Sequence, residues 1–283
     1  AAASQRATQL AEAATDCAPC SSALRSLASA SEERLEALGG LWDPWGGATP
    51  EGEKAPAPVS AAPTDVSAFI SWLARTATRD LEIAADPTRA DTEEARTLSA
   101  SALGRYASAV TLANAYGINL DAGEEEAAAI NDRVNTASRQ GTQTWAIDLF
   151  DEPAISSTFA PSGKDLASSE ELSEAVAMWD CTASTLPKAQ VVAGTLTDAY
   201  DVSGQLLTRA QVALRAGATD TRTPRCELPA TDAATLASNL LAVDAAMISS
   251  NSASVRAAGA SAALADIEQW APRTSLPALI AVR

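Results

Sequence analysis

The chain has 283 residues, enough for one large or two small domains that bury their own hydrophobic cores. Its 36 acidic residues outnumber its 20 basic residues, and the formal net charge of −16 disfavours binding to nucleic acids or anionic lipid headgroups. It contains no histidine, which excludes Ser-His-Asp and Cys-His catalysis, histidine-ligated haem and the Glu-x-x-His iron motif of ferritin-like bundles. We therefore expect a protein without cofactors or bound metal that acts by binding and not by catalysis.

The start of the chain predicts secretion. It begins AAASQR, without methionine, and small residues of this kind are typical around the cleavage point of a secretory signal. A lipid-bearing cysteine immediately before Ala1 would leave the same sequence, so a lipid anchor is compatible with it. The longest apolar stretches, such as LPALIAV, are much shorter than the roughly 20 residues that span a bilayer. We expect an extracytoplasmic protein of the cell envelope, with no transmembrane segment in this chain.

Apolar spacing predicts helices throughout the first half of the chain. The alanine-rich composition, with few aromatics and scattered β-branched residues, favours helix over strand. A linker rich in proline and glycine, 41–63, interrupts the helices, and Pro19 marks a break between the first two. The helical patterns cover about 4–16, 21–38, 64–85, 91–116 and 124–139.

Acidic pairs stand in the first turns of two predicted helices. Glu94 follows Asp91 by three residues, and Glu171 follows Ser168 by three, which is the spacing of a capping box. Carboxylates at these positions also complement the positive end of the helix dipole. We interpret these acids as helix starts and not as catalytic groups.

The second half predicts an antiparallel bundle. An irregular connection over 141–164 precedes helical patterns at about 168–186, 188–216, 231–249 and 252–270. Short connections place such helices next to one another in antiparallel order. The predicted fold class is all-α, with two packed antiparallel helical bundles, or one four-helix bundle with an added N-terminal helical layer. The predicted domains are 1–150, including the linker, and 165–283.

Four cysteines raise the question of disulfides or a metal. An even number of cysteines in a secreted chain favours two disulfides over a zinc site. The stretch CAPC, with Cys17 and Cys20, follows a predicted helix, whereas a thioredoxin-like redox centre follows a strand. The simplest of the three possible pairings joins Cys17 to Cys20 and Cys181 to Cys226.

The second of these pairings meets a geometric objection. An unbroken helix over 188–216 would carry the chain roughly 45 Å from the Cys181 end. Nine residues between Ala216 and Cys226 barely span that distance. Either the helix is interrupted near 200–204, or the loop runs back along the bundle, or the pairing crosses to Cys17 or Cys20.

Large apolar residues outside the helical stripes are the candidates for an interface. Interface anchors are typically tryptophan, tyrosine or arginine, and stripe positions are already used by the core. The stretches LWDPW and TWAIDLFD supply such residues. The candidates are Trp42, Trp45, Trp145, Leu149 and Phe150. The alternative interpretation is that these rings cover the bundle.

The layout resembles a family. A helix pair ending in EERLEALGG, a tryptophan-containing Pro/Gly linker and an Ala- and Arg-rich bundle are similar to extracytoplasmic lipoproteins of actinobacteria, some with ferritin-like bundles. The iron ligands of that fold are missing here. Some such envelope proteins accompany the cytochrome bcc–aa3 respiratory supercomplex as accessory subunits.

The expected compartment, the lack of catalytic groups and the tryptophan-bearing linker favour a non-catalytic accessory or scaffold subunit that docks on the outer face of a membrane protein complex, and the resemblance adds the respiratory supercomplex as a candidate partner. One alternative is a carrier that binds a small ligand or a cation between the two bundles. Another is a carboxylate-only enzyme, which needs two acids facing each other across a cleft.

Overall fold

A computed structural model describes residues 1–41, 49–53, 60–120, 166–193, 198–226, 228 and 232–281. Throughout these ranges the regular structure is helical and no strand is present, which confirms the all-α prediction. The expected helix over 124–139, the irregular connection over 141–164 and most of the linker lie outside the described residues. The α-helices are α1 (Ala2–Ala13), α2 (Ala18–Ala37), α3 (Val66–Ala85), α4 (Thr92–Tyr116), α6 (Glu170–Ala193), α7 (Ala199–Ala216), α8 (Ala233–Ile248) and α9 (Ala253–Trp270).

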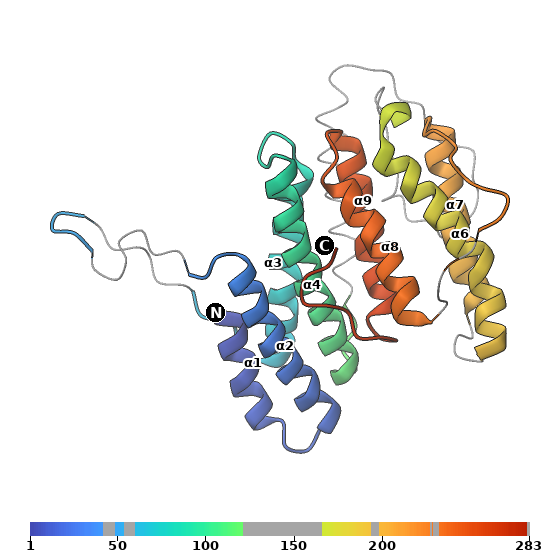
Figure 1. The fold of residues 1–283 in the computed structure, drawn as a ribbon. Helices are drawn as coiled ribbons and strands as arrows, with labels where there is room; N and C mark the ends of the chain where they lie inside the picture. The colour runs from blue at the N-terminus through green and yellow to red at the C-terminus, as the bar shows by residue number, and fades with distance from the viewer. Residues whose placement is uncertain are drawn as a thin grey trace.

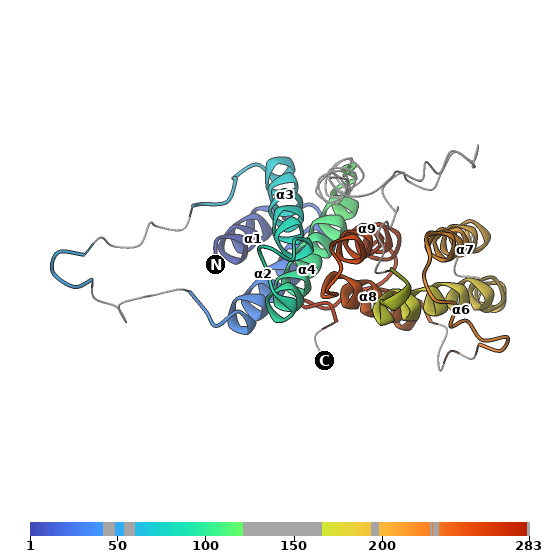
Figure 2. The ribbon, with the colours of Figure 1, turned by 90° about the horizontal axis from the view of Figure 1, so that it is seen from above.

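The helices form hairpins that stand side by side (Figures 1 and 2). Each hairpin joins two helices that follow one another in the sequence and pack together: α1 with α2, α3 with α4, α6 with α7, and α8 with α9. Seen from above, their order is α1–α2, α3–α4, α8–α9 and α6–α7. The last two hairpins therefore stand in the opposite order to their order in the sequence, and α8–α9 lies between α3–α4 and α6–α7.

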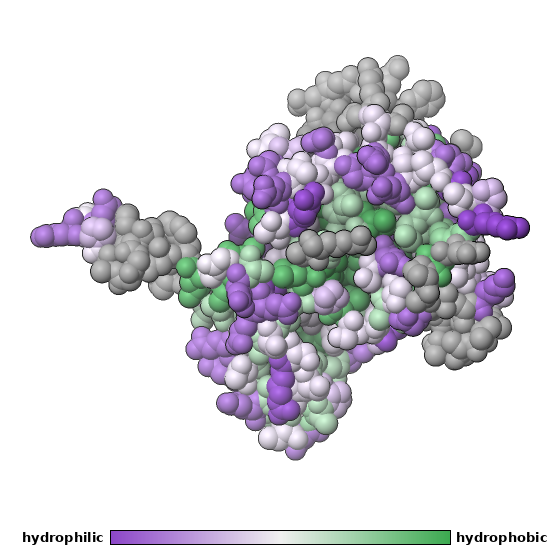
Figure 3. All heavy atoms as spheres, in the orientation of Figure 1, coloured by the Kyte–Doolittle hydropathy of each residue, from purple (hydrophilic) through white to green (hydrophobic). Residues whose placement is uncertain are grey.

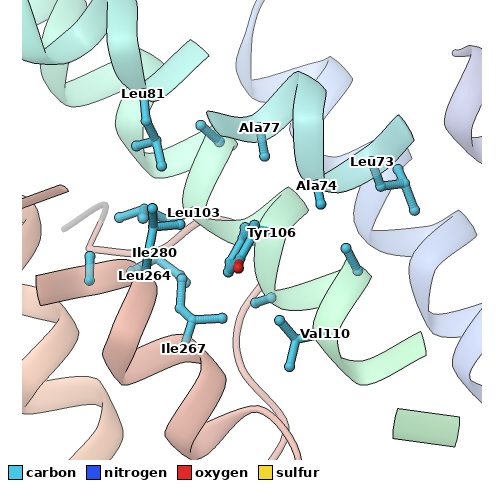
Figure 4. Packing of buried hydrophobic residues seen from close by; sticks show 14 of the residues in the cluster. Leu73, Ala74, Ala77, Leu81, Leu103, Tyr106, Val110, Leu264, Ile267 and Ile280 are labelled. Atoms are coloured by element: carbon cyan, nitrogen blue, oxygen red, sulfur yellow. The ribbon is translucent and has the colours of Figure 1, made fainter. Parts of the chain in front are cut away.

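A hydrophobic cluster joins the first four helices to α8 and α9. Leu103 and Tyr106 of α4 are fully buried next to Leu264 and Ile267 of α9, and Leu81 of α3 belongs to the same cluster (Figure 4). A second cluster fills the space among α6, α7, α8 and α9, where Trp179 and Trp270 are fully buried. Removal of this apolar area from water supplies about 25 cal/mol per Å². The hairpins are therefore layers of one packed body within the described ranges.

Local sequence signals explain most helix ends. The side chain of Asp91 accepts hydrogen bonds from the backbone N–H groups of Glu93 and Glu94, and the Asp91 N–H donates to the Glu94 carboxylate, so the predicted capping box is confirmed. In α6 the capping residue is Ser169, not the predicted Ser168. The backbone N–H of Leu172 donates to the Ser169 hydroxyl at 3.2 Å.

The predicted helix boundary at Pro187 is wrong, because α6 continues through this proline to Ala193. Proline lacks the N–H that would bond to the carbonyl four residues earlier, which is that of Ala183. The hydroxyl of Ser203 on α7 donates to this carbonyl at 2.6 Å instead. A neighbouring helix therefore satisfies the acceptor that Pro187 leaves free, and the helix is tolerated.

The C-terminal tail lies along α4 between the two halves (Figure 1). The backbone N–H of Ile280 donates to the Ala100 carbonyl at 3.2 Å. The buried guanidinium of Arg34 donates to the Ala278 carbonyl at 3.1 Å. Its pKa is lowered to about 10, mainly by burial and to a smaller extent by the positive charge of Arg105. At neutral pH Arg34 is charged, so this bond is charge-assisted.

Gly104 allows the C-terminal tail to approach α4 closely. A Cβ atom at Gly104 would lie 1.8 Å from the Ala278 carbonyl oxygen, a distance that no side chain can occupy. Arg256 makes a second tie between the halves: its buried guanidinium donates to the carbonyls of Ala84 and Ala90 at 3.0 and 2.8 Å and also to that of Ser250. These bonds fix the start of α9 against the end of α3.

Candidate functional site

The four cysteines form two pairs at disulfide distance. Cys17 and Cys20 have Cα atoms 5.2 Å apart, and Cys181 and Cys226 have Cα atoms 5.4 Å apart. This is the simplest of the pairings considered from the sequence, and none of the four is left as a free thiol.

The interruption between α6 and α7 removes the geometric objection. Helix α6 ends at Ala193 and α7 begins at Ala199, so the break between the helices comes earlier than the predicted interruption near 200–204. Since α7 has 18 residues, it runs back about 27 Å alongside α6. The segment that follows Gly217 therefore begins near Cys181, and Cys226 in this segment can pair with it.

The five residues proposed as interface anchors lie outside the described residues: Trp42, Trp45, Trp145, Leu149 and Phe150. Their described neighbours at the end of α2 are informative, however. Leu38 is 45% exposed and Leu41 is 60% exposed. On the face seen in Figure 3, hydrophobic residues gather where α2 ends and around the C-terminal tail. The other large apolar residues exposed on the described surface are Tyr200 and Leu207 of α7, far along the row of helices.

A buried polar cluster in the second half was not foreseen from the sequence. Arg209 of α7 makes two parallel hydrogen bonds to Asp266 of α9, at 3.0 and 2.9 Å. The indole N–H of Trp179 on α6 donates to Oδ1 of Asp244 on α8 at 3.1 Å. The guanidinium carbon of Arg209 lies 5.4 Å from the centre of the Trp179 ring. Each of the four helices α6–α9 thus contributes one residue.

Two carboxyl groups share one basic group in this cluster. Burial raises the pKa of Asp244, and the negative charge of Asp266 raises it further, so that it stands well above its ordinary value despite the opposing charge of Arg209. Burial alone would lower the pKa of Arg209, but the charges of Asp266 and Asp244 outweigh it and raise it. This shift favours the protonated form of Asp244, and with that proton bound the cluster of Asp244, Asp266 and Arg209 is electrically neutral.

The second carboxyl oxygen of Asp244, Oδ2, supports the protonated form of this residue. Oδ2 of Asp244 accepts no hydrogen bond from the described residues. A protonated Oδ2 that donates to Asp266 needs no such donor, and a hydrogen bond with Asp266 is one cause of the raised pKa of Asp244. A buried acceptor without a partner would otherwise cost about 1–3 kcal/mol.

This cluster is closed to substrates. Asp244 is fully buried, and Asp266 and Arg209 are 4% and 8% exposed. Two hollows on the described surface, of about 440 and 510 Å³, are lined by other residues. The smaller lies beside the first turn of α4, and the larger beside the Cys181–Cys226 disulfide. The arrangement can hold a proton and lock four helices together, but the acids do not face each other across an open cleft.

A sequence signal for the cluster existed. Asp244 follows Leu240 by four residues and precedes Met247 by three, so it occupies the apolar stripe of its own helix. A charged residue at a stripe position is buried and needs a partner. The pattern could have identified Asp244, but not the helices that supply Asp266 and Arg209.

The described ranges contain neither a group of metal-binding side chains nor a helix suited to a membrane. In those ranges, no three residues of the types Cys, Asp and Glu are grouped so as to hold a metal ion. No helix there is both long enough and apolar enough to cross a membrane. The chain matches no protein-family model, no curated protein and no solved structure.

Proposed function

We propose that this chain is a non-catalytic accessory subunit that works outside the cytoplasm and docks on the outer face of a membrane protein complex. The observation that carries the proposal is the exposed apolar end of α2, where Leu38 and Leu41 face solvent. They stand immediately before Trp42 and Trp45 in the sequence. Exposed apolar residues next to tryptophans are typical of surfaces that bind other proteins.

The charged groups of the interior support a binding role. Arg34 and Arg256 donate to backbone carbonyls, and Arg209 is paired with Asp266. These groups are used to join helices, so they are poor candidates for chemistry on a substrate. The packed row of hairpins instead forms a scaffold that presents the end of α2.

The disulfides support the proposed compartment, and the resemblance to envelope proteins supports the choice of the first partner to test. Paired cysteines are typical of oxidising compartments such as the bacterial periplasm and cell surface. A lipid anchor upstream of Ala1 would hold the chain at the membrane. The resemblance to actinobacterial envelope proteins makes the cytochrome bcc–aa3 supercomplex the first candidate complex.

The test is co-purification in mild detergent. Tagged protein is used to recover complexes from solubilised membranes, and the bound proteins are identified by mass spectrometry. We expect a defined membrane complex in stoichiometric amount. The double variant Leu38→Asp with Leu41→Asp is expected to lose it without a change in melting temperature, because both side chains are exposed.

The matched control is Tyr200→Asp with Leu207→Asp, which also places two charges on exposed apolar positions. It is expected to retain the complex. Equal recovery with both double variants would refute docking through the end of α2. Absence of any stoichiometric membrane protein from the wild-type sample would refute the accessory role.

A further inference from the structure

The CAPC stretch adopts a specific position relative to α2. Cys17 is the N-cap residue of this helix, and Pro19 stands in its first turn. The backbone N–H of Cys20 donates to Sγ of Cys17 at 3.3 Å. The sulfur of Cys17 thus occupies the place where a helix start stabilises negative charge, through both the free N–H group and the helix dipole.

The two sulfurs differ in exposure. Cys20 is 2% exposed, whereas Cys17 is half-buried, and the flanking residues Asp16, Ala18 and Pro19 are exposed. An incoming thiol can therefore approach Cys17 but not Cys20. This asymmetry assigns Cys17 as the sulfur that is attacked and Cys20 as the sulfur that leaves.

The buried sulfur already has a partner for its reduced form. Sγ of Cys20 lies 3.3 Å from the carbonyl oxygen of Ala115. In a disulfide this sulfur carries no hydrogen, but a Cys20 thiol would donate to that carbonyl. Ala115 lies in the last turn of α4, where carbonyls lack a partner within the helix. Both sulfurs thus have hydrogen-bonding partners in place for the dithiol state: the Cys20 N–H for Cys17 and the Ala115 carbonyl for Cys20.

We propose that Cys17 and Cys20 form a thiol–disulfide exchange centre that accepts two electrons from a dithiol of another protein. This activity is additional to the docking proposed above and does not depend on it. The Cys181–Cys226 disulfide serves a different purpose, because it joins α6 to the segment that follows α7, across 45 positions of sequence. Of the two disulfides it has the structural role, so its reduction provides the internal reference for that of Cys17–Cys20.

The exchange proceeds in two balanced steps. A thiolate of the partner attacks Sγ of Cys17, the bond between Cys17 and Cys20 breaks, and Cys20 leaves as a thiolate that takes up a proton. The second thiolate of the partner then attacks the partner's own sulfur in the mixed disulfide, and Cys17 leaves as a thiolate at the start of α2. The partner's dithiol is oxidised to a disulfide, and this chain gains two electrons and, once Cys17 is protonated, two protons.

The first test is a redox titration of the wild-type chain. Protein is equilibrated with increasing ratios of reduced to oxidised dithiothreitol, alkylated and mapped by mass spectrometry. We expect Cys17–Cys20 to be reduced at a ratio at least about tenfold lower than Cys181–Cys226, to reoxidise reversibly and to leave the helical dichroism spectrum unchanged. Reduction no earlier than Cys181–Cys226, or only together with loss of helix, would overturn the proposal.

The second test separates the roles of the two sulfurs. Ellman's reagent is added to Cys20→Ser, which leaves Cys17 as the free thiol, and to Cys17→Ser, which leaves Cys20. The thiol of Cys17 is expected to react at least about tenfold faster. Equal rates in two folded variants would refute the assignment of Cys17 as the attacked sulfur. If a variant does not fold, the wild-type titration decides the proposal by itself.

Discussion

Replacing Asp244 by asparagine should remove a pH dependence without disturbing the fold. In the protonated form, Oδ1 of Asp244 accepts from Trp179 and Oδ2 donates to Asp266. The amide of asparagine has the same shape, with an oxygen that accepts and an NH₂ group that donates. Asp244→Asn therefore mimics the protonated acid, and we expect the variant to fold and to retain both bonds.

The raised pKa of Asp244 sets the direction and the slope of the pH dependence of the free energy of unfolding. An aspartate in the unfolded chain has a pKa of about 4, and the pKa of Asp244 in the folded protein is raised well above this by burial and by Asp266. The stability due to this shift is fully present below the unfolded pKa and is lost as pH rises through the folded pKa. Between these two values the folded state binds a proton that the unfolded state releases, so the free energy of unfolding falls by about 1.4 kcal/mol per pH unit.

The assay is urea unfolding of wild type and Asp244→Asn at pH 5 and pH 6, at one ionic strength. The difference in the free energy of unfolding, variant minus wild type, should be larger at pH 6 than at pH 5, by up to about 1.4 kcal/mol. Asp201→Asn, which removes an exposed carboxylate from α7, is the control for a change in surface charge. The reasoning would be refuted if the variant were destabilised equally at both pH values, because Asp244 would then be ionised in the folded protein.

Three further perturbations test the packing. Replacing Cys181 and Cys226 by serine should lower the free energy of unfolding by about 4 kcal/mol, as measured by urea unfolding, and a loss below about 1 kcal/mol would contradict the loop-closure argument. Gly104→Ala should cost about 1–3 kcal/mol by displacing the C-terminal tail, whereas Gly204→Ala, with open space around it, should be neutral or stabilising. Arg256→Met should cost at least about 2 kcal/mol because buried carbonyls lose their donor, and wild-type stability would show that the tie between α3 and α9 is unimportant.

The helices themselves were predictable because their signals are local. Apolar spacing predicts the helix over 64–85, and Phe69, Ile70 and Leu73, which share one face of α3 by this spacing, are each at most 1% exposed. The capping box of α4 was likewise visible, since all its groups lie within four residues. The disulfide pairing was the simplest of three, although only the packing of α7 back along α6 explains how Cys226 reaches Cys181.

The errors and omissions concern long-range contacts. Pro187 does not end its helix because Ser203, on the next helix, supplies a donor to the carbonyl that the proline leaves free. The cluster of Asp244, Asp266 and Arg209 exists only where α7, α8 and α9 meet. The partner contact of Cys20 is with Ala115, 95 positions away. Pattern analysis within one helix contains no information about which residues other helices bring to it.

The most direct measurement of the docking proposal is site-specific photo-crosslinking on intact membranes. A photoreactive amino acid replaces Leu41 in one sample and Tyr200 in the other, both of which are exposed in the free chain. The proposal predicts that position 41 crosslinks to one subunit of a membrane complex, on its extracytoplasmic side, and that position 200 does not. Crosslinks from both positions in equal yield, or from position 41 only within the chain itself, would contradict docking through the end of α2.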